Sequence, residues 1–143
     1  MMQPDRVADV MGGAEILGSR IRSVQDLEAA VVTGLPKRAL RLTLERVCSS
    51  APQARTLLHR VVPEATYKRR ARLSAAESER TERLARVIAA AEYVWDNRDD
   101  AREWLTRPHP ELEGRPPLEA ALTELGARRA EELLDRLFYG IPA

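Results

Sequence analysis

Residues 73–95, LSAAESERTERLARVIAAAEYVW, decide the fold, because they combine a helix start with a long helical periodicity. Ser74 and Glu77 form the S-x-x-E pattern, in which each side chain satisfies a free backbone N–H at the start of a helix. Apolar residues then recur three or four positions apart, the spacing of one helix face. They are Leu84, Val87, Ile88, Ala91 and Trp95. The stretch predicts a helix over residues 75–95, with a solvated opposite face carrying Glu79, Glu82, Arg83 and Arg86.

Downstream of this helix, the pattern predicts shorter helices around one loop. Asp99 is expected to cap a short helix after residues 96–97, and residues 107–117, RPHPELEGRPP, form a loop by their Pro and Gly content. A helix begins at Pro117, and Gly126 is expected to separate it from a last helix. Four aromatic residues in this half are expected to lie mostly in the core. They are Trp95, Trp104, Phe138 and Tyr139.

Upstream of residue 73, three short helices follow one another with turns of only a few residues. They are expected over residues 36–47, from Pro52 onward, and over residues 63–71, after an earlier helix that starts at Ser23. Three short helices joined in this way fit the helix-turn-helix pattern. No segment shows the period-two alternation of a strand, so the predicted fold class is all-α.

Composition agrees with a folded helical protein. The chain has 143 residues, of which 44% are hydrophobic, 31% charged and 4% aromatic. No apolar run approaches the roughly 18–20 residues of a membrane span, and the N-terminus lacks the apolar core of a secretory signal. A single cysteine, Cys48, excludes an internal disulfide framework. We therefore expect a cytoplasmic protein with no membrane association.

The net charge of +1 hides a reversal of sign along the chain. Residues 36–72 carry ten Lys and Arg against two acids, whereas residues 73–143 carry ten Arg against fifteen acids. Charge segregation of this kind is informative about partners. The middle of the chain is expected to bind an anion.

The sequence contains no pattern typical of catalysis. His59 and His109 lie far apart, and neither has a Cys or carboxylate at metal-ligand spacing. There is no G-x-S-x-G elbow, phosphate-binding glycine loop or H-E-x-x-H pair. We expect no enzyme activity, no catalytic residue, no metal and no cofactor.

The helix over residues 63–71 is the predicted DNA-binding element. In a helix-turn-helix the second helix enters the major groove, and Arg and Lys neutralise phosphates there. The predicted DNA-binding residues are Thr66, Tyr67, Lys68, Arg69, Arg70 and Arg72. Other basic residues of this part could add backbone contacts; a solvated basic face without a partner is the alternative.

A series of motifs from residue 69 onward resembles the Xre/MbcA/ParS toxin-binding antitoxin family. In order they are RR followed by RLSAAESER (residues 72–80), RLARV (83–87), AREWL (101–105), LEGRPPLE (112–119) and LLDRLFYG (133–140). Upstream, GLPKRAL (34–40) and TYKRR (66–70) resemble the family's Xre-like DNA-binding portion. The link between TYKRR and RLS is shorter here than in the family, and lacks its glycine.

The resemblance implies an N-terminal helix-turn-helix region over residues 1–72 and a helical toxin-binding domain over residues 73–143. The implied partner is a toxin of the RES-domain class, which attacks NAD or uses it to modify a target. The antitoxin is expected to dimerise, to occlude the toxin's active site and to repress its own operon by binding operator DNA. The expected toxin-binding residues are Leu112, Gly114, Arg115, Pro117, Arg136, Tyr139, Gly140 and Ile141.

Two other hypotheses remain open from the sequence. One is a helix-turn-helix transcriptional regulator without a toxin partner, in which the C-terminal half serves dimerisation. The other is an antitoxin whose DNA-binding half has lost its function. The apolar C-terminal end could pack on its own domain or insert into a partner.

Overall fold

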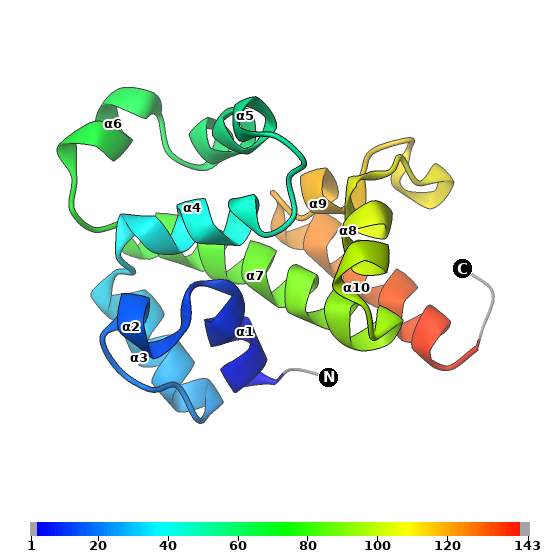
Figure 1. Cartoon of the computed structure of the whole chain (residues 1–143), viewed down its shortest axis with the longest axis horizontal. Coiled ribbons are helices and arrows are strands. Elements are labelled where there is room, and N and C mark those ends of the chain that lie inside the picture. Colours follow the sequence, from blue (N-terminus) through cyan, green and yellow to red (C-terminus); the bar gives the residue numbers. More distant parts are fainter. Residues whose placement is uncertain (1–2, 141–143) are drawn as a thin grey trace.

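The computed structural model describes residues 3–140, and Figure 1 shows that they fold into helices joined by short connections. The first six helices are α1 (Pro4–Val10), α2 (Gly13–Leu17), α3 (Val24–Thr33), α4 (Lys37–Glu45), α5 (Ala51–Val61) and α6 (Glu64–Arg69). The remainder are α7 (Ala75–Trp95), α8 (Arg98–Thr106), the 3₁₀ helix η1 (Pro110–Leu112), α9 (Pro117–Ala120) and α10 (Glu124–Phe138). Within residues 3–140 no strand forms, and one isolated antiparallel bridge joins Pro36 and Arg72. The predicted all-α class is confirmed.

No helix in the described range has the length and hydropathy that crossing a membrane requires.

Helix α7 has the predicted bounds and organises the core. The Glu77 backbone N–H donates to Ser74 Oγ (3.1 Å), and the Ser74 backbone N–H donates to Glu77 Oε1 (2.8 Å), so the predicted capping box is confirmed. Leu84 and Ile88 are fully buried. Helices α1, α3, α4 and α5 pack on α7 from the N-terminal half, and α8, α9 and α10 from the C-terminal half (Figure 1).

Both halves of the chain therefore share one core. A continuous cluster of buried apolar side chains extends from Val7 on α1 to Leu134 on α10. The predicted division between residues 72 and 73 falls just before α7. That division stays a prediction about function, because the packing continues across it.

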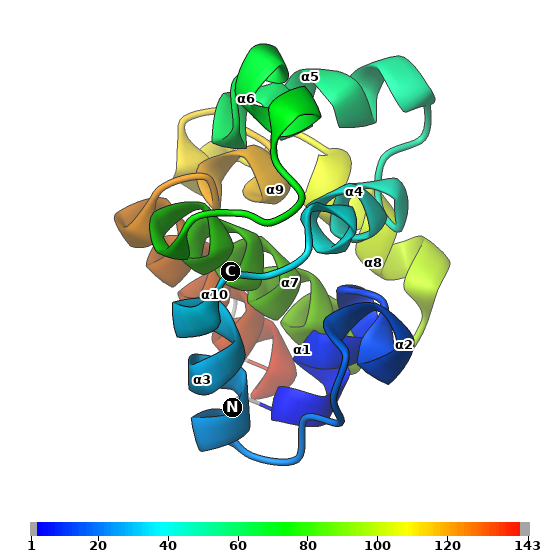
Figure 2. The same cartoon turned by 90° about the vertical axis from the view of Figure 1, so that its left-hand side faces the viewer.

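The three short helices before α7 form where the sequence predicts them. Helix α4 buries Leu40 and Leu44 completely. Helix α5 starts at the Ser50 cap, where Ser50 Oγ accepts the Gln53 backbone N–H at 3.2 Å. Only two residues separate α5 from α6. Figure 2 shows α5 and α6 on the opposite side of the molecule from α3, so this pair forms an outer layer.

Two predicted helix boundaries are wrong. Helix α8 is capped by Asn97, whose side chain accepts the Asp100 backbone N–H at 3.0 Å, and Asp99 lies in its first turn. Helix α10 starts after the Thr123 cap, so Gly126 lies inside this helix and does not precede it. A Cβ atom at position 126 would overlap the carbonyl oxygen of Ala120. Glycine is therefore needed at position 126 because the backbone of Ala120 approaches it closely, and not because a helix ends there.

The outer face of α7 is less solvated than its sequence predicts. Glu79 is exposed as expected, but the Glu82 and Arg86 side chains are only 14% and 23% exposed. Glu131 of α10 reaches this face, with its carboxylate 3.5 Å from Arg86 Nε. The prediction fails at these two positions because α10 packs beside them, which helical periodicity does not reveal.

The expectation that the aromatic residues are mostly core is also wrong. Trp95, Phe138 and Tyr139 are 37%, 41% and 68% exposed, respectively. Trp104 is half-buried and packs against a small cluster that contains Leu112. The C-terminal half therefore presents aromatic side chains on its surface.

Candidate functional site

Helix α6 stands at the edge of the fold and is anchored to α4 through Tyr67. Lys37 Nζ donates to the Tyr67 backbone carbonyl at 3.0 Å, and its ammonium lies 4.9 Å from the centre of the Tyr67 ring. The Tyr67 hydroxyl donates to the Lys37 carbonyl at 3.4 Å. None of the six residues of α6 is buried. Within α6, Tyr67 thus makes the contact with α4, and the other side chains are exposed or partly exposed.

The predicted DNA-binding residues divide into two groups. Arg70 pairs with Glu77 at 2.6 Å, and Arg72 Nη1 donates to the Gly34 carbonyl at 2.7 Å. Both therefore hold α6 and its following link against the rest of the fold. Lys68 is 74% exposed and has only an exposed i,i+4 pair with Glu64 at 3.1 Å. Arg69 is exposed, and within residues 3–140 it joins no ion pair.

The Arg70–Glu77 contact links α6 to the capping box of α7. Burial alone would raise the pKa of the Glu77 carboxyl, but hydrogen bonds from Ser74 and the charge of Arg70 lower it overall. Glu77 is therefore an anion that holds both the start of α7 and the base of α6.

Further basic side chains surround α6. Arg38 of α4 and Arg55 of α5 are exposed. The pKa of Glu64 at the start of α6 is lowered mainly by the hydrogen bond from Lys68, and to a smaller extent by the charge of Arg55. Arg41 pairs with Glu45 at 3.8 Å, with both side chains about half exposed. This surface can contact several phosphates, because phosphate binding requires charge and reach more than a fixed geometry.

The loop between α8 and α9, residues 107–116, is rigidly held. The His109 backbone N–H donates to the Arg115 carbonyl (3.1 Å), and the Gly114 N–H donates to the His109 carbonyl (3.0 Å). Arg115 Nε donates to the Leu112 carbonyl at 2.9 Å. These bonds close the loop on itself around η1. The Leu112 side chain packs with Ala120 of α9 and Leu133 of α10.

Two arginines of α10 fix this loop to the last helix. Arg129 donates to both carboxylate oxygens of Glu113 (2.8 and 2.6 Å) and to the Glu111 carbonyl (2.7 Å). Arg136 donates to Glu111 Oε1 at 3.1 Å. The hydrogen bond from Arg129 is the main cause of the lowered pKa of Glu113. The loop is thus ordered before any partner arrives, which reduces the entropy cost of binding.

The predicted toxin-binding residues occupy three kinds of position. Leu112 and Pro117 are buried, so in this conformation they support the loop and do not face a partner. Arg115 and Arg136 are partly exposed, and both already pair with glutamates of the loop. Gly114 lies at the open tip of the loop with φ +76°. Tyr139 and Gly140 are exposed at the end of α10. Ile141 lies outside the described residues.

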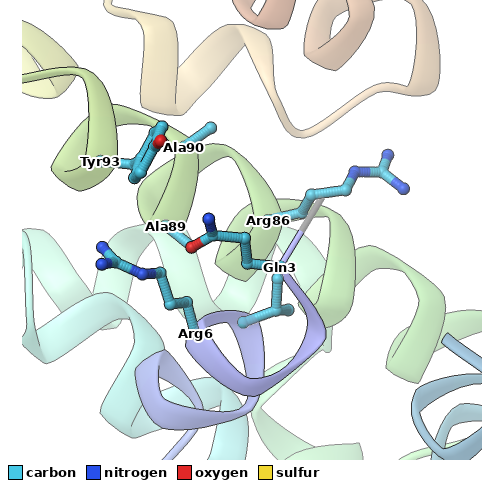
Figure 3. Close-up of a pocket in the computed structure, with 7 residues that line it drawn as sticks. Gln3, Arg6, Arg86, Ala89, Ala90 and Tyr93 are labelled. Carbon is cyan, nitrogen blue, oxygen red and sulfur yellow. The ribbon is translucent and has the colours of Figure 1, made fainter. Parts of the chain in front are cut away.

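An exposed aromatic cluster adjoins Tyr139, and the sequence analysis did not identify it. Phe138 stacks on Tyr93 of α7 with 5.6 Å between ring centres, and Tyr139 meets Phe138 edge-on at 5.1 Å. The Arg6 guanidinium of α1 lies 5.2 Å from the Tyr93 ring centre. Figure 3 shows Arg6 and Gln3 beside the face of α7 that carries Tyr93. The cavity there measures only about 10 Å³, so it suits no small-molecule ligand.

The sequence offers no signal for this cluster. Phe138 continues the apolar stripe of Leu134 at a spacing of four, so helical periodicity assigns it to the core. In the structure Phe138 is the last residue of α10, where the core beneath the helix ends.

The α6 surface and the loop of residues 107–116 lie at opposite ends of the molecule (Figure 1).

Comparison with known proteins matches both parts of the chain. Residues 26–86 match the antitoxin Xre-like helix-turn-helix domain, and residues 90–140 match the antitoxin Xre/MbcA/ParS C-terminal toxin-binding domain. The chain is 31% identical to "Antitoxin Xre" of Pseudomonas putida over 84 residues, which is 56% of this chain and 53% of that protein. The chain thus aligns with about half the length of that relative. The two matches follow one another in order, so the chain is similar to Xre/MbcA/ParS antitoxins over residues 26–86 and 90–140.

Proposed function

We propose that this protein is an antitoxin that neutralises a RES-domain toxin by covering the toxin's active site, and that it represses its own operon by binding operator DNA. The toxin would consume NAD or transfer ADP-ribose from it. The antitoxin would act as a homodimer within the complex and would perform no chemistry of its own.

The separation of two different surfaces carries this proposal. One end of the molecule presents the basic helix α6, and the other presents a rigid loop with exposed aromatic side chains nearby. A polyanion and a protein partner require these two kinds of surface.

On the toxin side, inhibition by occlusion requires a preformed shape and a few deeply buried anchors. The Arg129–Glu113 bonds supply the preformed loop. Tyr139 and Phe138 supply exposed rings, with Tyr93 stacked on Phe138, and aromatic residues are frequent binding hot spots. Gly114 and Arg115 form the side of the loop that faces solvent.

On the DNA side, α6 is the second helix of the helix-turn-helix and would enter the major groove. Thr66, Lys68 and Arg69 are the side chains there that make the fewest bonds to the rest of the fold. Arg70 and Arg72 would act mainly by positioning α6, because both are bonded to the fold.

The decisive experiment is affinity capture of the tagged full-length protein from its native cells, followed by mass spectrometry and an NAD-consumption assay. We expect a RES-domain protein in stoichiometric amount, inactive in the complex and active once separated. Recovery of the protein bound to DNA but without a toxin would overturn the antitoxin proposal in favour of the plain transcriptional regulator.

Paired variants separate the two proposed surfaces. Lys68→Ala/Arg69→Ala should weaken operator binding and reduce the salt dependence of log K by about one to two charges, with neutralisation unchanged. Phe138→Ala/Tyr139→Ala should weaken toxin binding about tenfold or more, with operator binding unchanged. If either pair impaired both activities equally in a folded protein, the two-surface proposal would be wrong.

A further inference from the structure

A pocket of about 300 Å³ opens where the end of α7 meets α8 and the first residues of the loop 107–116. Figure 1 shows α8 beside the C-terminal end of α7. Two tryptophans line the pocket: Trp95, the last residue of α7, is 37% exposed, and Trp104 of α8 is half-buried. Asp100, Glu103 and Arg107 line it as well. Along α8 these residues recur three or four positions apart, so one face of the helix forms a wall of the pocket.

The Trp104 ring is held in place by the loop. The His109 ring meets it edge-on, with 6.3 Å between ring centres. His109 is itself fixed, because its Nδ1 accepts the Glu111 backbone N–H at 3.1 Å. Trp104 also packs against the small cluster that contains Leu112. This wall of the pocket is therefore ordered before a ligand arrives, which reduces the entropy cost of binding.

The pocket contains a carboxylate without a cationic partner. Arg107 pairs with Glu103, so the charge of Glu103 is already neutralised. Arg98 and Arg102, the arginines within α8, pair with other carboxylates. Asp100 is exposed, and among residues 3–140 it joins no ion pair. An unpaired negative charge thus lies beside two indole rings.

Indole rings beside a free carboxylate are surroundings that a cation prefers. Tryptophan attracts a cation more strongly than the other aromatic side chains do. Within the described residues, the cations that lie over rings are Lys37 and Arg6, over Tyr67 and Tyr93, so the chain places none of its own over the two indoles. A guanidinium suits the pocket better than an ammonium. Its plane stacks on an aromatic ring, and its N–H groups bind a carboxylate through two parallel hydrogen bonds.

We propose that this pocket receives an arginine side chain of the toxin, with the guanidinium against Trp95 and Trp104 and hydrogen-bonded to the Asp100 carboxylate. All residues that line the pocket lie within residues 90–140, the part that matches the toxin-binding domain. The pocket is also continuous with the loop 107–116, on the side where we place the toxin. The inference rests on the proposed function for the identity of the partner, but the pocket's chemistry stands without it.

The first arm of the test titrates the full-length protein with the peptide acetyl-Gly-Arg-Gly-amide and follows the indole N–H signals by heteronuclear NMR. The chain contains two tryptophans, and Trp95→Phe identifies the signal of each. We expect both signals to shift saturably at millimolar peptide. The same peptide with citrulline, which keeps the shape of arginine without its charge, should leave both signals unchanged. An equal response to the two peptides, or no response to either, would overturn the proposal.

Variants then test the two kinds of contact. Asp100→Asn should weaken binding of the arginine peptide about threefold, because it removes the unpaired charge. Asp99→Asn is the matched control, since it removes the same charge from the same turn of α8 at a position that does not line the pocket. Its affinity should equal that of the wild type. Trp95→Leu should weaken binding about threefold, because it keeps an apolar side chain but removes the ring. Wild-type affinity of Asp100→Asn or of Trp95→Leu contradicts the proposal.

The second arm repeats the affinity capture of the toxin with these variants. The complex excludes water from the pocket, so Asp100→Asn and Trp95→Leu should each weaken toxin binding about tenfold or more, whereas Asp99→Asn should not. Undiminished toxin binding by both pocket variants would overturn the proposal. If the wild type itself captures no toxin, the proposed function fails, whereas the peptide titration still decides whether the pocket binds arginine.

Discussion

Arg69, Arg70 and Arg72 are neighbours of similar type, but they have different roles. Arg69 faces solvent, Arg70 contacts Glu77, and Arg72 donates to the Gly34 carbonyl. A side chain that is bonded within the fold is occupied there, whereas an exposed one without an ion pair is available to a partner. The total charge of the segment therefore overstates the charge that the proposed DNA contact could use.

Substitution at these positions should separate the roles. Arg70→Ala is expected to lower the free energy of unfolding by about 0.5–1 kcal/mol, because it removes a partly exposed ion pair. Arg69→Ala should leave the free energy of unfolding unchanged. Urea titrations followed by circular dichroism measure both. Equal stability of the two variants would show that the Arg70–Glu77 pair contributes nothing.

Gly126 is a residue whose replacement should be costly. A Cβ atom there would overlap the Ala120 carbonyl oxygen, and both residues are buried. Gly126→Ala should therefore destabilise the protein by about 3 kcal/mol through overpacking. Gly114→Ala, at a positive φ but with open space around it, should cost about 1–2 kcal/mol. If Gly126→Ala were the milder change in urea unfolding, the close approach would be disproved.

Among the helices, α7 depends most clearly on its first turn. Its capping box combines Ser74 and Glu77, and Arg70 extends the same cluster toward α6. The start of α7 and the placement of α6 are thus coupled through one carboxylate. A change at the cap should affect both helices.

Ser74→Ala should lower the free energy of unfolding by about 1 kcal/mol, the usual cost of losing a helix cap. Ser19→Ala, at an exposed position outside the helices, should have no effect. Urea unfolding at neutral pH distinguishes them. Similar midpoints for the two variants would contradict a stabilising role for the capping box.

The same cap predicts a pH dependence. The pKa of Glu77 is lowered in the folded protein, so its stabilising contribution is present above the carboxyl pKa of the unfolded chain and is lost as pH falls through the folded value. Burial raises the pKa of Glu82 and of Glu131, so these two carboxyl groups change the stability with pH in the opposite direction. The comparison is therefore between the wild type and Glu77→Gln. Their difference in stability should shrink as pH falls below about 4; a constant difference would contradict the prediction.

At the scale of the whole molecule, the two parts of the chain that match antitoxin domain families share one core. Helices from both sides of residue 73 bury their apolar faces against α7. The part of the chain matched by the helix-turn-helix family itself extends to residue 86, inside α7. The part of the chain that matches this family therefore includes the first half of α7, the helix on which α3, α4 and α5 pack.

A fragment of residues 1–72 should accordingly fail to fold, because it lacks the helix against which α1, α3 and α4 pack. The full chain should unfold in a single cooperative transition. Amide NMR spectra of the fragment and calorimetry of the full chain test these expectations. A well-dispersed spectrum of the fragment would show that the N-terminal region folds independently.

The sequence by itself determined the features that depend on neighbours along the chain. The Ser74–Glu77 box, the Ser23 cap and the helical stripe of Leu84 and Ile88 are local signals. The bounds of α7 follow from the box and the stripe. The resemblance to the antitoxin family likewise rests on short motifs in a fixed order. Local geometry is sufficient for such features because a helix satisfies its backbone within a few residues.

Only the tertiary structure decided which side chains are available. Arg86 became only partly exposed because Glu131 of α10 reaches it. Phe138 became exposed because the core ends beneath the last turn of α10. Gly126 is needed because its backbone approaches Ala120, and not because it interrupts a helix. In each case the cause is a contact or a missing contact between different helices. A pattern along one helix shows which residues share a face, but the neighbouring helices determine whether that face meets protein or solvent.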